Sequence, residues 1–184
     1  MTIEQKNDAS GENREIRLQA DQDQFLTFLL GDETYGIDIL RVQEIRGWES
    51  PTKLPNMPNY IKGVINMRGA VVPIIDMRER FSISEPTYDE STVVIIVHVH
   101  LHTDSSEHDT VKTIGLVVDG VSDVHDVDLA NLQHAPNFGD SRRVSEEFVR
   151  GLATLEAIMV IILNIDLLAN QGIFEEVRHY SRAG

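Results

Sequence analysis

The sequence predicts an all-β protein. Three observations lead to this prediction: short apolar segments of strand length recur along the chain, several alternate apolar with polar residues, and Gly, Pro, Asn and Asp separate them. Little of the sequence has the 3.6-residue spacing of an amphipathic helix. About eight short strands with little helix are typical of a β-barrel architecture.

The first predicted elements are a hairpin and a helical turn. Residues 25–30 are apolar except for one threonine and end at a Gly-Asp turn signal, and residues 35–39 then alternate apolar with small or polar residues. These two segments predict an antiparallel hairpin. Ile39, Val42 and Ile45 recur every three residues, a spacing that indicates a turn or two of helix instead.

The middle of the chain predicts a second hairpin and two long strands. Residues 64–67 and 70–77 are apolar except for Asn66 and Asp76 and flank an Arg-Gly pair, which indicates a hairpin. Pro73 has no N–H for a ladder hydrogen bond, so its strand is expected at a sheet edge or with a bulge. Residues 92–101 are rich in β-branched side chains and residues 113–121 alternate, so both are predicted to be strands.

The last third of the chain predicts one more strand between irregular segments. Asp119-Gly120 could close a type I′ hairpin, but β-branched residues continue on both sides, so a bend or bulge is equally compatible. Residues 158–163 predict a buried strand and residues 166–168 the start of a short helix. We expect a disordered polar tail over residues 1–24 and a second tail over residues 171–184 that can form a short helix.

Composition excludes several classes of protein. The chain has 184 residues and no cysteine, which excludes disulfides, thiolate zinc sites and a Cys nucleophile. Lys and Arg number 16 against 30 Asp and Glu, and the net charge of −14 disfavours binding to nucleic acid or to anionic lipid. The longest apolar run, 157–163, is far shorter than the ~20 residues of a membrane span. We therefore expect a soluble, acidic, cytoplasmic protein without a signal peptide.

The sequence offers little support for catalysis and one weak pattern for metal binding. No phosphate-binding GxxxxGK[ST] or GxGxxG motif, HExxH motif or GxSxG motif occurs, so we expect no enzyme and no cofactor. His98, His100 and His102 would leave the same face of a strand and could bind zinc or nickel. An ordinary exposed strand face explains the same spacing, and it is the interpretation we favour because no carboxylate or thiolate partner is evident.

Two charged residues lie among aliphatic residues. Arg68 lies at the turn of the second predicted hairpin, and Glu44 lies between Val42 and Ile45. An arginine held by a carboxylate would present a rigid polar group on an apolar groove. The alternative is a plain surface ion pair, which contributes ~0–1 kcal/mol.

Three motifs, two of which contain these charged residues, resemble the CheW family, the coupling proteins of bacterial chemotaxis. LGDETYGIDILRVQEIRG at 30–47 is similar to the opening of the family. IKGVINMRG at 61–69, continuing through 72–78, is similar to its second hallmark. IGLVVDGVSDV at 114–124 is similar to the third, and the likeness continues through NIDLL at 164–168. Ordered motifs at the family's spacing are far more specific than any one alone.

The resemblance implies a fold and a function for residues 25–170. It implies two SH3-like five-stranded β-barrel subdomains with a few short helices. It also implies a non-catalytic adaptor that couples the cytoplasmic tips of chemoreceptors to the regulatory domain of the histidine kinase CheA, and it allows contacts with other CheW copies. Such an adaptor would be cytoplasmic and recruited to membrane-associated receptor arrays. Alternatives are a CheW-type adaptor of a non-flagellar kinase pathway and a metal-binding protein using the histidine-rich strand.

The resemblance also implies which residues meet the partners. In the family, a groove between the subdomains receives the helical hairpin of the receptor. The residues expected to couple receptor and kinase are Val42, Glu44, Gly63, Asn66, Arg68 and Gly69. Phe138 matches a loop position expected to contact a neighbouring kinase domain. The connection 98–112 is longer and richer in histidine than is usual in the family, so the resemblance gives it no role.

Overall fold

The computed structural model describes residues 22–101, 110–134, 146–170, 173, 174 and 177. The first sheet contains β1 (Gln22–Leu30), β2 (Glu33–Asp38), β8 (Gly120–Asp128), β9 (Val149–Leu155) and β10 (Ile158–Leu163). The second sheet contains β3 (Val42–Gly47), β4 (Ile61–Met67), β5 (Ala70–Asp76), β6 (Val93–Leu101) and β7 (Thr110–Val118). The short helices are η1 (Ile39–Arg41), α2 (Met77–Arg80), η2 (Leu129–Asn131), η4 (Glu146–Phe148) and α3 (Ile165–Asn170).

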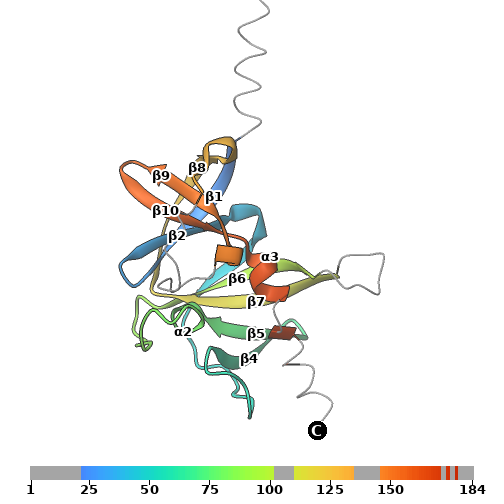
Figure 1. The fold of residues 1–184 in the computed structure, drawn as a ribbon. Coiled ribbons are helices and arrows are strands. Elements are labelled where there is room, and N and C mark those ends of the chain that lie inside the picture. The colour runs from blue at the N-terminus through green and yellow to red at the C-terminus, as the bar shows by residue number, and fades with distance from the viewer. Residues whose placement is uncertain (1–21, 102–109, 135–145, 171–172, 175–176, 178–184) are drawn as a thin grey trace, which may run out of the picture.

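The chain crosses between the two sheets twice (Figure 1). It leaves the first sheet at η1, builds the whole second sheet, and returns at Asp119, the bend between β7 and β8. The strand orders are β8-β1-β2-β10-β9 and β3-β6-β7-β5-β4. Most neighbours are antiparallel, whereas β2 with β10 and β5 with β7 are parallel. The first sheet therefore combines strands from both ends of the described chain.

A central core lies between the sheets. Every second residue of the main strands enters it, as the period of two in a β-strand requires. Its members include Leu26, Phe28 and Leu30 of β1, Ile95, Val97, Val99 and Leu101 of β6, and Ile114, Leu116 and Val118 of β7. An aromatic row through Phe28, Tyr35, Phe81 and Phe148 has ring centroids 6.0, 6.0 and 6.4 Å apart.

Each sheet also has a smaller core on its other face. The first sheet buries Phe25, Val127, Ala153, Val160 and Ile162 there, and the second buries Val72, Ile74, Val94, Ile96 and Val117. Strands buried on both faces are continuously apolar instead of alternating. This explains the unbroken run of β-branched residues at the start of β6.

The mostly β class is confirmed, as are both predicted hairpins, β1–β2 and β4–β5. The closed SH3-like barrels are not confirmed, because neither described sheet has its edge strands paired with each other. The predicted helix through Ile39, Val42 and Ile45 is wrong beyond the single turn of η1, since Val42 begins β3. Pro73 is not at an edge, because β5 lies between β4 and β7, and its pairing with β7 begins only at Ile74. The predicted alternative, a bulge, has a counterpart in the partner strand: the β4–β5 register shifts between Ile61 and Gly63.

The ends of the chain are only partly described. β1 begins at Gln22, and residues 1–21 lie outside the described part. Ile173 is helical and buried in the central core. The division into tails at 1–24 and 171–184 around a domain at 25–170 stays a prediction. None of the helices in the described part of the chain is long and apolar enough to cross a membrane.

Candidate functional site

The first crossover places an exposed leucine beside the central core. The Asp38 carboxylate accepts a hydrogen bond from the Leu40 N–H at 2.9 Å and so begins η1. Ile39 and Val42 pack partly buried against the central core. Leu40 between them is 84% exposed, more than any other exposed large apolar residue in the described chain. The crossover thus presents apolar side chains at the rim of the space between the sheets.

A register irregularity in β3 separates its apolar and charged side chains. The pairing with β6 shifts between Val42 and Glu44, which adds one residue to β3. Val42 and Ile45 lie opposite central-core residues of β6, whereas Glu44 lies opposite Ile96, which belongs to the second sheet's smaller core. Ile45 is 44% exposed, so β3 carries a second exposed apolar side chain after Leu40 of η1.

The predicted Glu44 site is part of a small charged group. Arg46 lies 3.9 Å from the Glu44 carboxylate and 3.3 Å from that of Glu49. Beside it is a shallow hollow lined by Arg46, Gly47, Glu49, Ile65, Ile74 and Val94. These residues come from both edge strands of the second sheet, β3 and β4, from β5 and β6, and, for Glu49, from the segment just after β3. The hollow therefore lies at the unpaired seam of this sheet.

Three predicted site residues form the β4–β5 turn. Arg68 has φ 51° and Gly69 has φ 87°, as in a two-residue type I′ hairpin. The Asn66 side-chain oxygen accepts a hydrogen bond from the Gly69 N–H at 3.0 Å and holds the turn. Arg68 is exposed and forms no hydrogen bond or ion pair within the described chain. Among the described residues, therefore, no carboxylate holds the Arg68 fork, and Glu44 instead lies in a surface ion pair with Arg46.

Gly63 has a different, structural reason to be glycine. Its φ is 139°, and a Cβ there would lie 2.2 Å from the Thr52 carbonyl oxygen. Thr52 and Val64 exchange two backbone hydrogen bonds of 2.9 Å, so the 51–53 segment lies directly along the outer edge of β4. Gly63 allows this close approach of two backbones.

The structure describes two of the four remaining predicted residues, His98 and His100. His98 and His100 lie on β6 and both are partly exposed. The His98 ring has Thr113 Oγ1 at 3.4 Å from Nδ1. His102 and Phe138 lie outside the described residues. Within the described part, no group of three or more His, Asp or Glu side chains could hold a metal ion.

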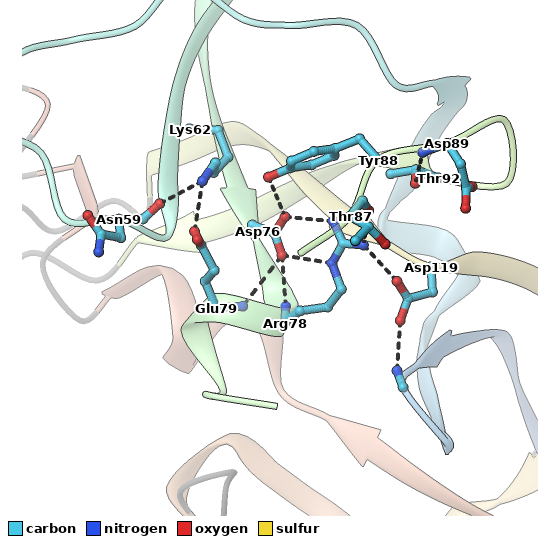
Figure 2. Close-up of polar contacts among 11 residues, drawn as sticks. Asn59, Lys62, Asp76, Arg78, Glu79, Thr87, Tyr88, Asp89, Thr92 and Asp119 are labelled. Carbon is cyan, nitrogen blue, oxygen red and sulfur yellow. Dashed lines mark hydrogen bonds and ion pairs between the residues drawn. The ribbon is translucent and has the colours of Figure 1, made fainter. Parts of the chain in front are cut away.

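A buried polar cluster was not predicted from the sequence (Figure 2). The Asp76 carboxylate accepts hydrogen bonds from Arg78 Nε at 3.1 Å, from Arg78 Nη2 at 2.8 Å and from the Tyr88 hydroxyl at 2.9 Å. Both Asp76 and Arg78 are almost completely buried. Burial disfavours the Arg78 charge, but the hydrogen bonds that Arg78 donates to Asp76 and Asp119, together with the negative charge of these carboxylates, outweigh it and raise the arginine's pKa. The Asp76-Met77-Arg78 spacing was the available signal, but spacing alone does not show burial.

Asp119 links this cluster to the first sheet at the second crossover. Its carboxylate accepts hydrogen bonds from Arg78 Nη1 and from the Gly31 N–H, both at 2.7 Å. Its own N–H donates to the Leu29 carbonyl oxygen at 3.0 Å. One carboxylate therefore joins α2, on the second sheet's side, to the β1–β2 turn of the first sheet, as Figure 2 shows.

A second carboxylate joins the sheets at the first crossover. Asp166 of α3 accepts from Arg41 Nη2 at 2.8 Å and from the backbone N–H of His100 at 2.7 Å. Leu167, the next residue of α3, is 44% exposed. The Arg41–Asp166 pair brings η1 and α3 together, so that exposed leucines adjoin both ends of the same ion pair.

The sequence of this chain is similar to those of known proteins. Residues 24–172 match the family model described as the CheW-like domain. The chain belongs to the CheW family. A CheW chemotaxis protein of Klebsiella aerogenes is 43% identical over 145 residues, which cover 79% of this chain and 80% of that protein. A probable CheW of Rhizobium etli is 32% identical over 148 residues, with 80% and 88% coverage.

A solved structure supports the same conclusion. The crystal structure of the scaffolding protein TtCheW from Thermoanaerobacter tengcongensis superimposes with a TM-score of 0.67 and 31% sequence identity. The match covers 80% of this chain and 87% of that one. CheW membership makes this chain a chemotaxis coupling adaptor, in agreement with the resemblance of its motifs. The metal-binding alternative finds no support in these comparisons.

Proposed function

We propose that this CheW chain is a non-catalytic adaptor that binds the cytoplasmic tips of chemoreceptors and the regulatory domain of the histidine kinase CheA. It would be recruited from the cytoplasm to receptor arrays at the membrane. Val42, Glu44, Gly63, Asn66, Arg68 and Gly69 are the proposed coupling residues. Phe138 is proposed as a further kinase contact.

The observation that carries this proposal is the apolar rim, defined by Leu40, Ile45 and Leu167, beside partly buried Ile39 and Val42. A receptor helix with an apolar stripe could bury these side chains against its own, the usual way in which a helix binds a groove. Burial of exposed apolar surface contributes ~25 cal/mol per Å² before the costs of association. The rim belongs to the space between the sheets, where the resemblance implies that the receptor binds.

The exposed charges supply specificity beside this rim. Arg68 is an exposed guanidinium that has no ion pair with the described residues, on a turn held by Asn66, and Glu44 is a half-exposed carboxylate. Charged groups at the edge of an interface mainly select the partner and speed association. We expect each binary contact to be of micromolar strength, and an array strengthens it because each further contact becomes intramolecular. Signalling then requires only that the adaptor bind the active and inactive states of its partners unequally.

Substitution of Leu40 tests the proposal. Leu40→Ser should weaken binding of a chemoreceptor cytoplasmic fragment about tenfold, because a leucine side chain contributes ~1.5–3 kcal/mol when buried. The free energy of unfolding should stay within about 0.5 kcal/mol, because the side chain is exposed in the free protein. Ile158→Ser is the matched control, since Ile158 is 57% exposed on β10. Calorimetric titrations in which both variants bind like the wild type would contradict the rim as the receptor site.

A further inference from the structure

Arg80, the last residue of α2, carries a charge that nothing in the described chain neutralises. Its Nε is the one buried side-chain nitrogen or oxygen of the described residues without a hydrogen-bond partner. Its neighbours in α2 differ: Arg78 binds two carboxylates, and Glu79 pairs with Lys62 at 2.9 Å. A partly buried guanidinium without an acceptor is costly and calls for a physical explanation.

Two aromatic rings fix the position of this guanidinium. Arg80 Cζ lies 5.0 Å from the centroid of the Tyr60 ring and 5.1 Å from that of Phe148, within the range of cation–π attraction. Phe148 is buried in the central core and stacks on Phe81. The backbone of Tyr60 is held by a 2.7 Å hydrogen bond from the Asp76 N–H to its carbonyl oxygen. The rings therefore orient the guanidinium in advance.

The terminal nitrogens of Arg80 remain available for binding. The side chain is partly exposed, Nη1 and Nη2 form no hydrogen bond or ion pair with the described residues, and neither is among the buried atoms without a partner. The two terminal nitrogens carry four N–H donors in the plane of the fork, which matches the two oxygens of a carboxylate. Arg80 also lies where the two sheets meet, because Tyr60 comes just before β4 of the second sheet and Phe148 just before β9 of the first sheet.

We propose that Arg80 binds the carboxylate of an Asp or Glu side chain of a protein partner. The inference rests on the proposed adaptor function and adds a contact outside the predicted coupling residues. A protein carboxylate is favoured over nucleic acid because the net charge of −14 repels a phosphate backbone, whereas one carboxylate needs only a local cation. Pre-orientation by the rings lowers the entropy lost when the ion pair forms.

Three variants test this contact in the full chain. Arg80→Met removes the charge and keeps the aliphatic stem, Arg80→Lys keeps the charge without the planar fork, and Arg150→Met removes an exposed arginine of β9 as the matched control. Affinities are measured by calorimetry for a receptor cytoplasmic fragment and for the CheA regulatory domain. Arg80→Met should weaken one of the two complexes about tenfold to a hundredfold. Arg80→Lys should recover only part of the loss, and Arg150→Met should change neither affinity more than twofold.

A second measurement separates binding from a purely structural role. The Nε–Hε resonance of Arg80 in the wild-type protein should shift when the affected partner is added, and this measurement does not depend on the folding of any variant. If the wild type binds neither partner, the proposed function fails. If the wild type binds but its Arg80 resonance does not move and Arg80→Met binds both partners equally well, this inference is overturned while the adaptor function stands.

Discussion

At the scale of single residues, the most consequential side chains are the ones that the sequence did not single out. Arg68 and Glu44 stand out in the sequence because they interrupt aliphatic runs, and both are exposed or half-exposed. Asp76, Arg78 and Asp119 look like ordinary charged residues in the sequence, yet buried Asp76 and Arg78 and half-buried Asp119 form a link between the sheets. Burial depends on which strands meet in space, and a charge's position in the sequence does not determine this.

Removal of Arg78 should strongly destabilise the protein. Arg78→Met leaves the Asp76 carboxylate buried without its cation, and breaking a buried pair in this way costs about 3–5 kcal/mol of unfolding free energy. Arg46→Met is the control, because Arg46 is 34% exposed and its surface pairs contribute about 0–1 kcal/mol. Urea unfolding measures both. A loss for Arg78→Met no larger than the control's would show that the cluster is not a stabilising link.

Tyr88 should make stability depend on alkaline pH. Burial, and then the Asp76 carboxylate, raise the pKa of Tyr88 above its ordinary value of about 10. The folded state therefore keeps a proton that the unfolded state releases above about pH 10, so this stability is complete below that pH and is lost as pH rises further. Tyr88→Phe should be less stable than the wild type at pH 7, and the difference should shrink above pH 10. A difference that stays constant from pH 8 to 11 would contradict this.

At the scale of elements, the hairpins were predictable and the crossovers were not. Hairpins depend on local turn signals, and the Arg68-Gly69 turn has the positive φ angles of its class. The three-residue recurrence of Ile39, Val42 and Ile45 instead arises from one 3-10 turn followed by the irregularity in β3. This combination places apolar residues on one side at the spacing of a helix. Sequence spacing alone cannot distinguish it from a true helix.

Gly63 should be needed for the 51–53 segment to lie against the outer edge of β4. Gly63→Ala adds a Cβ that meets the Thr52 backbone and imposes a left-handed φ on alanine, at a combined cost of about 2–4 kcal/mol. Gly47→Ala is the control, because a Cβ at Gly47 meets nothing within 4 Å. The free energy of unfolding and the hydrogen-exchange protection of the Thr52 and Val64 amides report the effect. Equal stability of the two variants would contradict the close approach at Gly63.

At the scale of the whole molecule, one central core and two carboxylate links hold two sheets together. Asp166 joins the sheets beside η1, where the chain passes from the first sheet to the second, and Asp119 joins them where the chain returns. The partners of these carboxylates are far apart in sequence: Arg78 and Asp119 are separated by 41 residues, and Arg41 and Asp166 by 125. The spacing of residues in a single sequence does not show which of these distant charges pair. The family motifs nevertheless predicted the CheW family and its adaptor function, because they occur in the family's order and at its spacing.

This architecture suits a protein that works by contact alone. The rigid core keeps the apolar rim, the Arg68 turn and the Arg80 guanidinium in fixed relative positions. We expect the signal to pass through differences in binding to the partners' states, with no chemical step in the adaptor.

The most direct test of the adaptor function is CheA autophosphorylation, reconstituted with receptor cytoplasmic fragments in the presence and absence of this protein. We predict that the protein raises receptor-controlled kinase activity. Arg68→Glu should abolish that rise with an unchanged melting curve, because Arg68 is exposed and unpaired in the described chain. Kinase activity that does not respond to the folded wild-type protein would contradict the coupling function.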